Sequence, residues 1–188
     1  MQKKIFILSW PAWVGKNTLW NIVRPLSSTY IEESISTTTR TPIRVWEQNG
    51  VDYYFVSKGE FEKKIHAGEF LEYAVVHTFY YGSTKRELER INRLWKTPIY
   101  IIEPQWMIHL KPLLEDEWYQ VVTIFLLPPS LEEMKRRLRN RGTESEEQFQ
   151  IRLATAMTEF EQQEFYDIRI VNDDLEKTKN ELLAILKM

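Results

Sequence analysis

The start of the chain decides the fold, because residues 5–19, IFILSWPAWVGKNTL, pass from an apolar run into a loop that ends in Gly15-Lys16. A helical segment follows, and this setting lets backbone N–H groups and a helix N-terminus face an anion. The pattern G-x-x-x-x-G-K-[ST] is only half present, since Trp10 replaces its first glycine and Asn17 its hydroxyl residue, with Thr18 one position late. Taken alone, the stretch fits a phosphate-binding loop or an ordinary strand-to-helix turn.

Short apolar runs predict the strands of a buried parallel sheet. Each run is nearly all apolar rather than alternating, as in strands that are covered on both faces. The runs are residues 5–8, 99–102, 121–127 and 168–171. Charged stretches with helical spacing lie at residues 85–94, 131–139, 146–160 and 175–186. Strands that alternate with helices predict an α/β fold, a parallel sheet flanked by helices.

The composition excludes several classes of function. The 188 residues allow one domain with insertions, against a prior of ~150 residues per domain. The 25 basic and 27 acidic side chains leave a net charge of −2, which argues against broad binding of nucleic acid or membrane surfaces but allows a local phosphate site. The absence of cysteine excludes disulfides, thiolate metal sites and cysteine nucleophiles. No apolar run approaches the ~20 residues of a membrane span, so we expect a cytoplasmic protein.

Residues 36–84 interrupt the alternation of strands and helices, because they are polar and rich in tyrosine. We interpret them as an inserted subdomain. Their motifs are STTTRTPIR at 36–44, GVDYYFVS at 50–57, GEFLE at 68–72 and YYGST at 80–84, and later come FLLPPSL at 125–131 and VNDDL at 171–175. In order and spacing these motifs closely resemble those of guanylate kinases, over residues 5 to 186.

This resemblance implies a P-loop nucleoside monophosphate kinase fold. Its parts would be a core of residues 1–34, 86–127 and 159–188, an insert at 35–85 that binds GMP, and a lid at 128–158. The implied reaction transfers the γ-phosphate of ATP to GMP and gives ADP and GDP, with Mg²⁺. The implied partners are ATP and GMP, with no nucleic acid and no membrane, and the protein would be a monomer or a homodimer.

The resemblance assigns two groups of residues to GMP. Around the acceptor phosphate it places Arg40, Arg44, Tyr53 and Tyr81. The family spaces its two arginines three positions apart and here they are four apart, which makes Arg44 the poorer match. Around the base it places Glu72, Ser83 and Ser36, and at the end of the second core strand Glu103, which could orient magnesium waters or the acceptor. The arginines also fit exposed surface residues, and Glu103 a strand-end residue that faces solvent.

For the donor, the resemblance assigns the loop and the lid. The residues implied in ATP binding are Trp10, Pro11, Ala12, Trp13, Val14, Gly15, Lys16, Asn17, Thr18, Arg137 and Asn172. Those implied in catalysis are Lys16, Arg40, Arg137, Arg141 and Arg152, since phosphoryl transfer needs positioning and charge neutralisation more than covalent chemistry. Asn17 is the candidate contact to magnesium, although the family has a hydroxyl residue there.

Tryptophans align with glycines of the family pattern, at positions 10, 13, 46, 95 and 106. The chain has 6 glycines and 7 tryptophans, where average usage of ~7% would give about 13 glycines. Two explanations stay open: a chain that has lost catalysis, or UGA codons translated as tryptophan where the organism inserts glycine. With them stays an alternative function, a catalytically impaired interaction module, against which the intact Arg40, Glu72 and Tyr81 argue. Another nucleoside monophosphate kinase fits poorly with Glu72 and Ser83.

Overall fold

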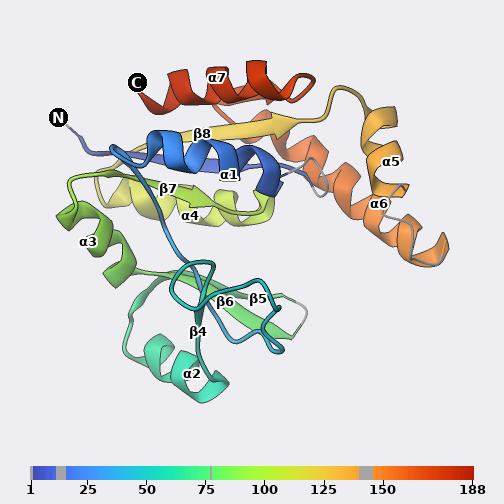
Figure 1. The fold of residues 1–188 in the computed structure, drawn as a ribbon. Coiled ribbons are helices and arrows are strands. Elements are labelled where there is room, and N and C mark those ends of the chain that lie inside the picture. Colours follow the sequence, from blue (N-terminus) through green and yellow to red (C-terminus); the bar gives the residue numbers. More distant parts are fainter. Residues whose placement is uncertain (1, 12–15, 77, 140–145) are drawn as a thin grey trace.

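A five-stranded parallel sheet forms the centre of the fold (Figure 1). The structure is a computed structural model that describes residues 2–11, 16–76, 78–139 and 146–188, without the side chains of Lys16, Asn17, Arg137 and Gln148. In sheet order the strands are β2 (Ile31–Glu33), β7 (Thr97–Ile101), β1 (Lys4–Ser9), β8 (Gln120–Leu127) and β9 (Ile168–Val171). All neighbouring strands pair in parallel, which confirms the α/β prediction.

Both faces of this sheet are buried, which explains why its strands read as continuous apolar runs. On one face Phe6 and Leu8 pack in a cluster with side chains of α1 (Lys16–Ser27) and α7 (Leu175–Leu186). On the other face Ile5 and Ile7 pack against α3 (Lys85–Arg93) and α4 (Pro104–Asp116). Alternate residues of β1 therefore hold two separate layers of helices.

The inserted subdomain has its own small sheet, which lies below the core in Figure 1. Its strand order is β4 (Tyr54–Phe55), β3 (Thr37–Thr38), β6 (Phe79–Thr84) and β5 (Phe70–Val76). Helix α2 (Lys58–His66) begins at a capping box made by Ser57 and Glu60. Its buried Phe61 stacks on Phe70 at 4.3 Å and on Tyr80 at 5.0 Å between ring centroids, so α2 covers one face of the small sheet.

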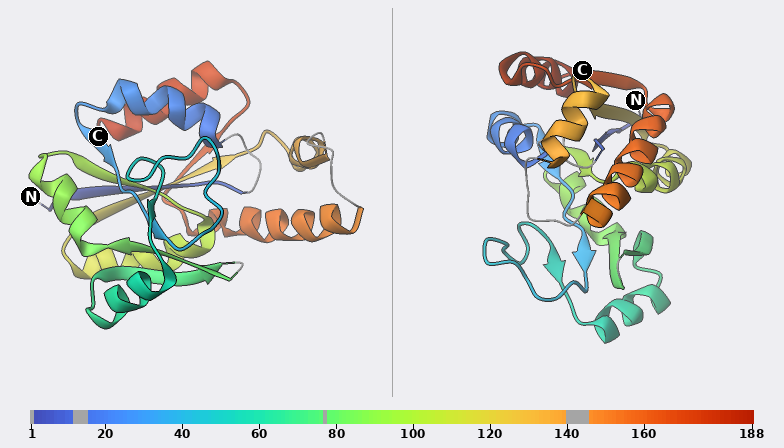
Figure 2. Two further views of the ribbon diagram at one scale, coloured as in Figure 1. Left: turned by 60° about the horizontal axis from the view of Figure 1, so that its bottom comes forward. Right: turned by 90° about the vertical axis from the view of Figure 1, so that its right-hand side faces the viewer.

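The predicted lid forms a pair of helices beyond the carboxyl end of β8. Figure 2 shows α5 (Leu131–Arg139) and α6 (Glu146–Glu161) projecting away from the central sheet. A short 3₁₀ helix (Gln162–Phe165) returns the chain to the core. Within the described ranges, no helix combines the length and apolar character that a membrane crossing requires.

Two helix ends place tryptophan where the backbone favours glycine. Trp95 follows the C-cap of α3 with φ 57°, and Trp118 follows the C-cap of α4 with φ 64°. A left-handed residue just after a helix is most often glycine, because a Cβ there crowds the backbone. The side chains are 92% and 78% exposed, so no core packing holds either indole in place. Trp95 was matched to a family glycine by sequence, whereas Trp118 was not.

Candidate active site

Strand register brings the predicted base-binding residues into one row of the small sheet. Glu72 of β5 pairs directly with Ser83 of β6. Thr37 of β3 pairs with Gly82, so extending that register by one residue places Ser36 beside Ser83. Side chains in one row project from the same face of a sheet. Three residues that are far apart in sequence therefore share one surface, opposite the face that α2 covers.

Gly82 permits the close approach of β5 and β6 beside this row. A Cβ on Gly82 would lie 2.8 Å from the backbone oxygen of Glu72 and 2.8 Å from a ring carbon of Phe70. A β-bulge lies in β5 between Phe70 and Glu72. Without a Cβ at Gly82 the two strands can pair closely, and after the bulge Glu72 lies directly opposite Ser83.

The Glu72 carboxyl group has an unusual protonation equilibrium. Burial raises its pKa to about 7, and hydrogen bonds from the side chain and backbone of Ser83 only partly oppose that effect. Ser83 itself is 1% exposed. A carboxylate held in a desolvated position beside a hydroxyl is suited to accept hydrogen bonds from a ligand that can donate two.

Arg40 lies in a compact cluster of charged and aromatic side chains. Its Nη2 donates to both carboxylate oxygens of Glu47, each at 2.6 Å. Its guanidinium lies 5.6 Å from the centroid of the Tyr53 ring, and the Tyr53 ring lies 6.0 Å from that of Tyr81. Arg40, Tyr53 and Tyr81, which the family resemblance assigns to the acceptor phosphate, lie close together in the structure.

The electrostatics of this cluster keep Glu47 ionised. Burial opposes its ionisation, but the Arg40 side chain and the backbone N–H of Arg44 lower the pKa of Glu47 below its ordinary value. Burial, with Tyr81 beside it, raises the pKa of Tyr53 to about 12, so its hydroxyl remains a donor at neutral pH. Glu47 belongs to the stretch that resembles the family, but no role was predicted for it, because its pairing with Arg40 is visible only in the structure.

Arg44 and Glu103, the other two residues predicted for the acceptor, are exposed rather than buried in the cluster around Arg40. The Arg44 side chain is 58% exposed, with Nη1 3.6 Å from a Glu47 oxygen. Glu103 is exposed at the N-cap of α4, where its side chain makes no capping bond and accepts from Gln105 at 3.1 Å. Trp106, in the first turn of α4, makes an edge contact with Tyr81 at 6.3 Å, so this helix end faces the insert.

On the donor side, the loop after β1 is described only at its two ends. Ser9 is fully buried, and Pro11 is buried as well. Trp10 is 8% exposed and belongs to the core cluster with Trp20 and Val23. The Trp10 side chain therefore packs into the core and does not occupy the loop.

The remaining donor residues are placed only in part. Residues 12–15, and with them Ala12, Trp13, Val14 and Gly15, lie outside the described residues, as do Arg141 and the side chains of Lys16, Asn17 and Arg137. Thr18 is exposed in the first turn of α1. Asn172 follows β9, is 9% exposed, and its N–H donates to the carbonyl of Leu127 at 2.8 Å. Arg152 is half-buried on α6.

Comparison with known proteins agrees with this geometry. The family model "Guanylate kinase" matches residues 2–188. The chain belongs to the guanylate kinase family. It is 44% identical to a guanylate kinase of Protochlamydia amoebophila over 97% of this chain and 89% of that protein, and 38% identical to one of Chlamydia felis over 97% and 86%. A crystal structure of guanylate kinase from Anaplasma phagocytophilum aligns with a TM-score of 0.74 at 32% identity, over 99% of this chain and 85% of that one.

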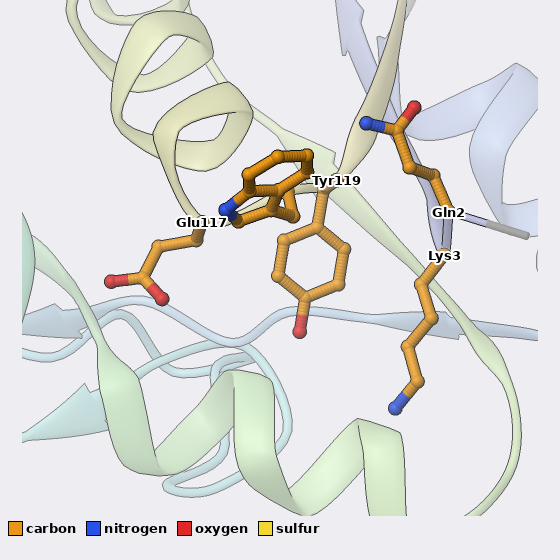
Figure 3. Close-up of a pocket in the computed structure, with 5 residues that line it drawn as sticks. Gln2, Lys3, Glu117 and Tyr119 are labelled. Atoms are coloured by element: carbon orange, nitrogen blue, oxygen red, sulfur yellow. The ribbon is translucent and has the colours of Figure 1, made fainter.

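Guanylate kinases are ATP:GMP phosphotransferases, and the small sheet of this member is the GMP-binding subdomain of the family fold. The predicted donor loop, Glu103 and the predicted lid follow the carboxyl ends of β1, β7 and β8, and ligands of open α/β sheets bind at that edge. Figure 3 shows a different hollow, of about 500 Å³, lined by Gln2, Lys3, Glu117, Trp118 and Tyr119. That hollow lies at the amino ends of β1 and β8, at the opposite edge of the sheet from the predicted nucleotide-binding residues.

Proposed function

We propose that the insert of this guanylate kinase holds GMP between the row of Glu72, Ser83 and Ser36 and the cluster around Arg40. The observation that carries the proposal is the register pair of Glu72 and Ser83 beside the contacts of Arg40 with Tyr53. Guanine presents N1–H and an exocyclic amine side by side, and one carboxylate can accept both hydrogen bonds. Adenine presents an acceptor at the equivalent position, which would leave Glu72 unpaired.

The acceptor phosphate would lie against Arg40, with Tyr53, Tyr81 and Arg44 around it. Glu47 engages only Nη2 of Arg40 through its two oxygens, and Nη1 donates to the carbonyl of Pro42 at 3.3 Å. A guanidinium carries five N–H donors, so this anchored arginine retains donors for phosphate oxygens. Glu47 would thereby fix the orientation of the Arg40 guanidinium that binds the phosphate.

The donor side would use the loop of residues 10–18. Backbone N–H groups there and the Lys16 ammonium group would hold the phosphates of ATP, and Asn172 would lie near its base. Arg137, Arg141 and Arg152 of the lid would approach the transferred phosphoryl group and neutralise its charge. The acceptor phosphate is itself an anionic nucleophile, so the reaction needs no catalytic base.

The described residues fit a magnesium ion that arrives with ATP. Among them, no three histidine or acidic side chains lie close enough together to hold a metal ion. Mg²⁺ in kinases is held mainly by substrate phosphates and water with one or two protein ligands. Glu103, exposed at the end of β7, and Asn17 are the side chains that we assign to its water shell. The ion would neutralise charge on the phosphates.

We assign residues 35–85 to the GMP-binding unit, residues 128–158 to the lid and the rest to the core. A cytoplasmic monomer or homodimer fits substrates that are soluble nucleotides. Since the indole of Trp10 packs in the core rather than in the loop, this tryptophan gives no reason to prefer an interaction module over an enzyme.

The test of the acceptor site is Arg40→Ala, measured by calorimetric titration with GMP and with guanosine. A charge-assisted bond contributes about 1.5–3 kcal/mol, so affinity for GMP should fall roughly tenfold to a hundredfold while that for guanosine barely changes. Lys58→Ala on exposed α2 removes a positive charge from the same insert and serves as the control. Equal losses for the nucleotide and the nucleoside would show that Arg40 does not bind the phosphate.

A further inference from the structure

The backbone crosses between the core and the insert at two places, and one buried carboxylate contacts both crossings. The chain enters the insert through residues 34–36, between β2 and β3, and leaves it through Thr84 at the start of α3 (Figure 1). Glu87 lies in the first turn of α3, and its side chain is 3% exposed. A buried ionisable group of this kind needs a full set of partners.

Glu87 finds those partners on both sides of the junction. One of its oxygens accepts the backbone N–H of Ile35 at 3.1 Å, and the other accepts the hydroxyl of Tyr54, on β4 of the insert, at 3.2 Å. The backbone hydrogen bonds on the two sides of Ile35 go to different parts of the fold. The N–H of Ser34 donates to the carbonyl of Ile99 in the core, and the carbonyl of Ser36 accepts from the N–H of Tyr54 in the insert. Glu87 therefore occupies the point where the core ladder ends and the insert ladder begins.

The core side of this junction is the stronger one. Arg90, one turn along α3, donates to both Glu87 oxygens at 3.0 and 2.9 Å. Arg90 also donates to Glu32 of β2 at 3.2 Å, and Lys96 donates to the same carboxylate at 2.8 Å. Charge-assisted bonds of this kind are roughly twice as strong as neutral ones. Charge-assisted bonds from Arg90 thus hold Glu87 on the core side, whereas the insert side chain that bonds it among the described residues is the neutral hydroxyl of Tyr54.

We propose that Glu87 is a positioning residue, which sets the orientation of the GMP-binding insert relative to the core through the Tyr54 hydroxyl. Tyr53 and Ser36, which the proposed function places at the acceptor, are the immediate chain neighbours of Tyr54 and Ile35, so a shift at this contact moves the acceptor site. Transfer between two bound nucleotides depends steeply on their alignment. This inference rests on the proposed function for its kinetic consequence, but not for its structural one.

The structural consequence is measurable without any nucleotide. The chain has no cysteine, so Lys63→Cys on α2 and Asn180→Cys on α7 can carry a pair of spin labels, and both positions are exposed. In this labelled protein, Tyr54→Phe removes only the hydroxyl that reaches Glu87. We expect double electron–electron resonance to show a distance distribution at least about twofold broader than in the parent, since the hydrogen bond from Tyr54 to Glu87 no longer holds the insert. Tyr73→Phe, at a tyrosine 47% exposed on β5 of the same insert, should leave the distribution unchanged.

The kinetic consequence separates positioning from binding. Without the label cysteines, Tyr54→Phe should lower kcat about two- to tenfold, while the Kd for GMP from calorimetry changes less than about twofold. A distance distribution that Tyr54→Phe leaves unchanged, or that Tyr73→Phe broadens equally, would overturn the proposal. So would a lowered Tm with unchanged width, which marks a merely structural contact. Failure of the parent protein to bind GMP would instead contradict the proposed function and leave the width test standing.

Discussion

At the scale of single residues, two tryptophans adopt a left-handed backbone conformation that glycine normally takes. Trp95 and Trp118 end helices with φ 57° and 64° and expose most of their indole. Glycine takes this conformation without steric cost. Both explanations of the tryptophans, loss of function or UGA read as tryptophan, apply to Trp95. Trp118 does not align with a family glycine, but its left-handed backbone conformation also favours glycine. UGA at codons 95 and 118 would support recoding, and UGG would exclude it there.

Trp95→Gly and Trp118→Gly should each stabilise the protein. The non-glycine residue costs of order 1 kcal/mol in this conformation, and each substitution should raise the free energy of unfolding in urea by about that amount.

Trp20→Gly is the matched control, because the Trp20 indole is buried and donates to Glu33 at 2.7 Å. There the same change should destabilise by about 3–5 kcal/mol. Destabilisation at positions 95 and 118 would show that these indoles contribute packing that the geometry does not reveal.

The second feature at this scale is the protonation of Glu72. Burial raises its pKa from 4.5 to about 7. Because the pKa of an acid is raised, ionising Glu72 in the ligand-free protein costs stability progressively as the pH rises from 4.5 to about 7. A guanine that donates two hydrogen bonds would favour the ionised form and so bind with release of a proton.

Affinity for guanosine should therefore rise with pH and level off above about 7. Below that pH the affinity should change by up to about tenfold per pH unit, since binding is linked to loss of one proton. Guanosine is the ligand of choice because it has no phosphate that titrates. Glu72→Gln should bind weakly with a flat profile, and an equally steep profile in that variant would assign the proton to another group.

Among the elements of the central sheet and its flanking helices, β2 and α4 could not be predicted from sequence, whereas the others could. The strand β2 has only three residues, of which Glu32 and Glu33 are polar, so it lacks an apolar run. Helix α4 has Pro112 inside it, which breaks the helical pattern in the sequence, although Pro104 at its start is favourable. Both elements form because the neighbouring parts of the core supply their partners.

The candidate site was predictable only through motifs. No periodicity indicates that Ser36, Glu72 and Ser83 meet, because register between β3, β5 and β6 brings them together. Glu47 and Glu87 were missed for the same reason. Each is one charged residue in a charged stretch, and only its partners in space distinguish it.

The close pairing of β5 and β6 leads to a prediction at this scale. A Cβ at position 82 would lie 2.8 Å from the backbone of Glu72, a contact that only movement of the strands can relieve. Gly82→Ala should destabilise the protein by about 1–3 kcal/mol and weaken GMP binding, as measured by urea unfolding and calorimetry.

The control for this prediction is Gly59→Ala in α2, where nothing lies within 4 Å of the added Cβ. That change should stabilise the protein by about 0.5–1 kcal/mol, because alanine is the better helix former. If Gly82→Ala folded as stably as the parent and bound GMP equally well, the close approach would have no role in shaping the base site.

At the scale of the whole molecule, the fold places the two proposed nucleotide sites on different parts, the parallel core with its lid and the inserted small sheet. The proposed donor loop and lid follow strands β1 and β8 of the parallel sheet, and the residues proposed to bind the base and phosphate of GMP lie in the small sheet and its loops. Contacts between the two parts include residues 34–36, the start of α3, the edge contact of Tyr81 with Trp106, and Leu71 of β5, which packs against the core. Such an arrangement lets each part bind its nucleotide before the two are brought together.

The most direct test of this arrangement is phosphoryl transfer by the chain itself, followed by phosphorus NMR with ATP, Mg²⁺ and either GMP or AMP. We expect GDP and ADP to form in equal amounts from GMP, and AMP to react at least about a hundredfold more slowly, because Glu72 rejects its base. Glu72→Ala should remove most of that preference. Equal rates with GMP and AMP, or ATP consumption that does not depend on GMP, would contradict a guanine-specific acceptor site in the insert.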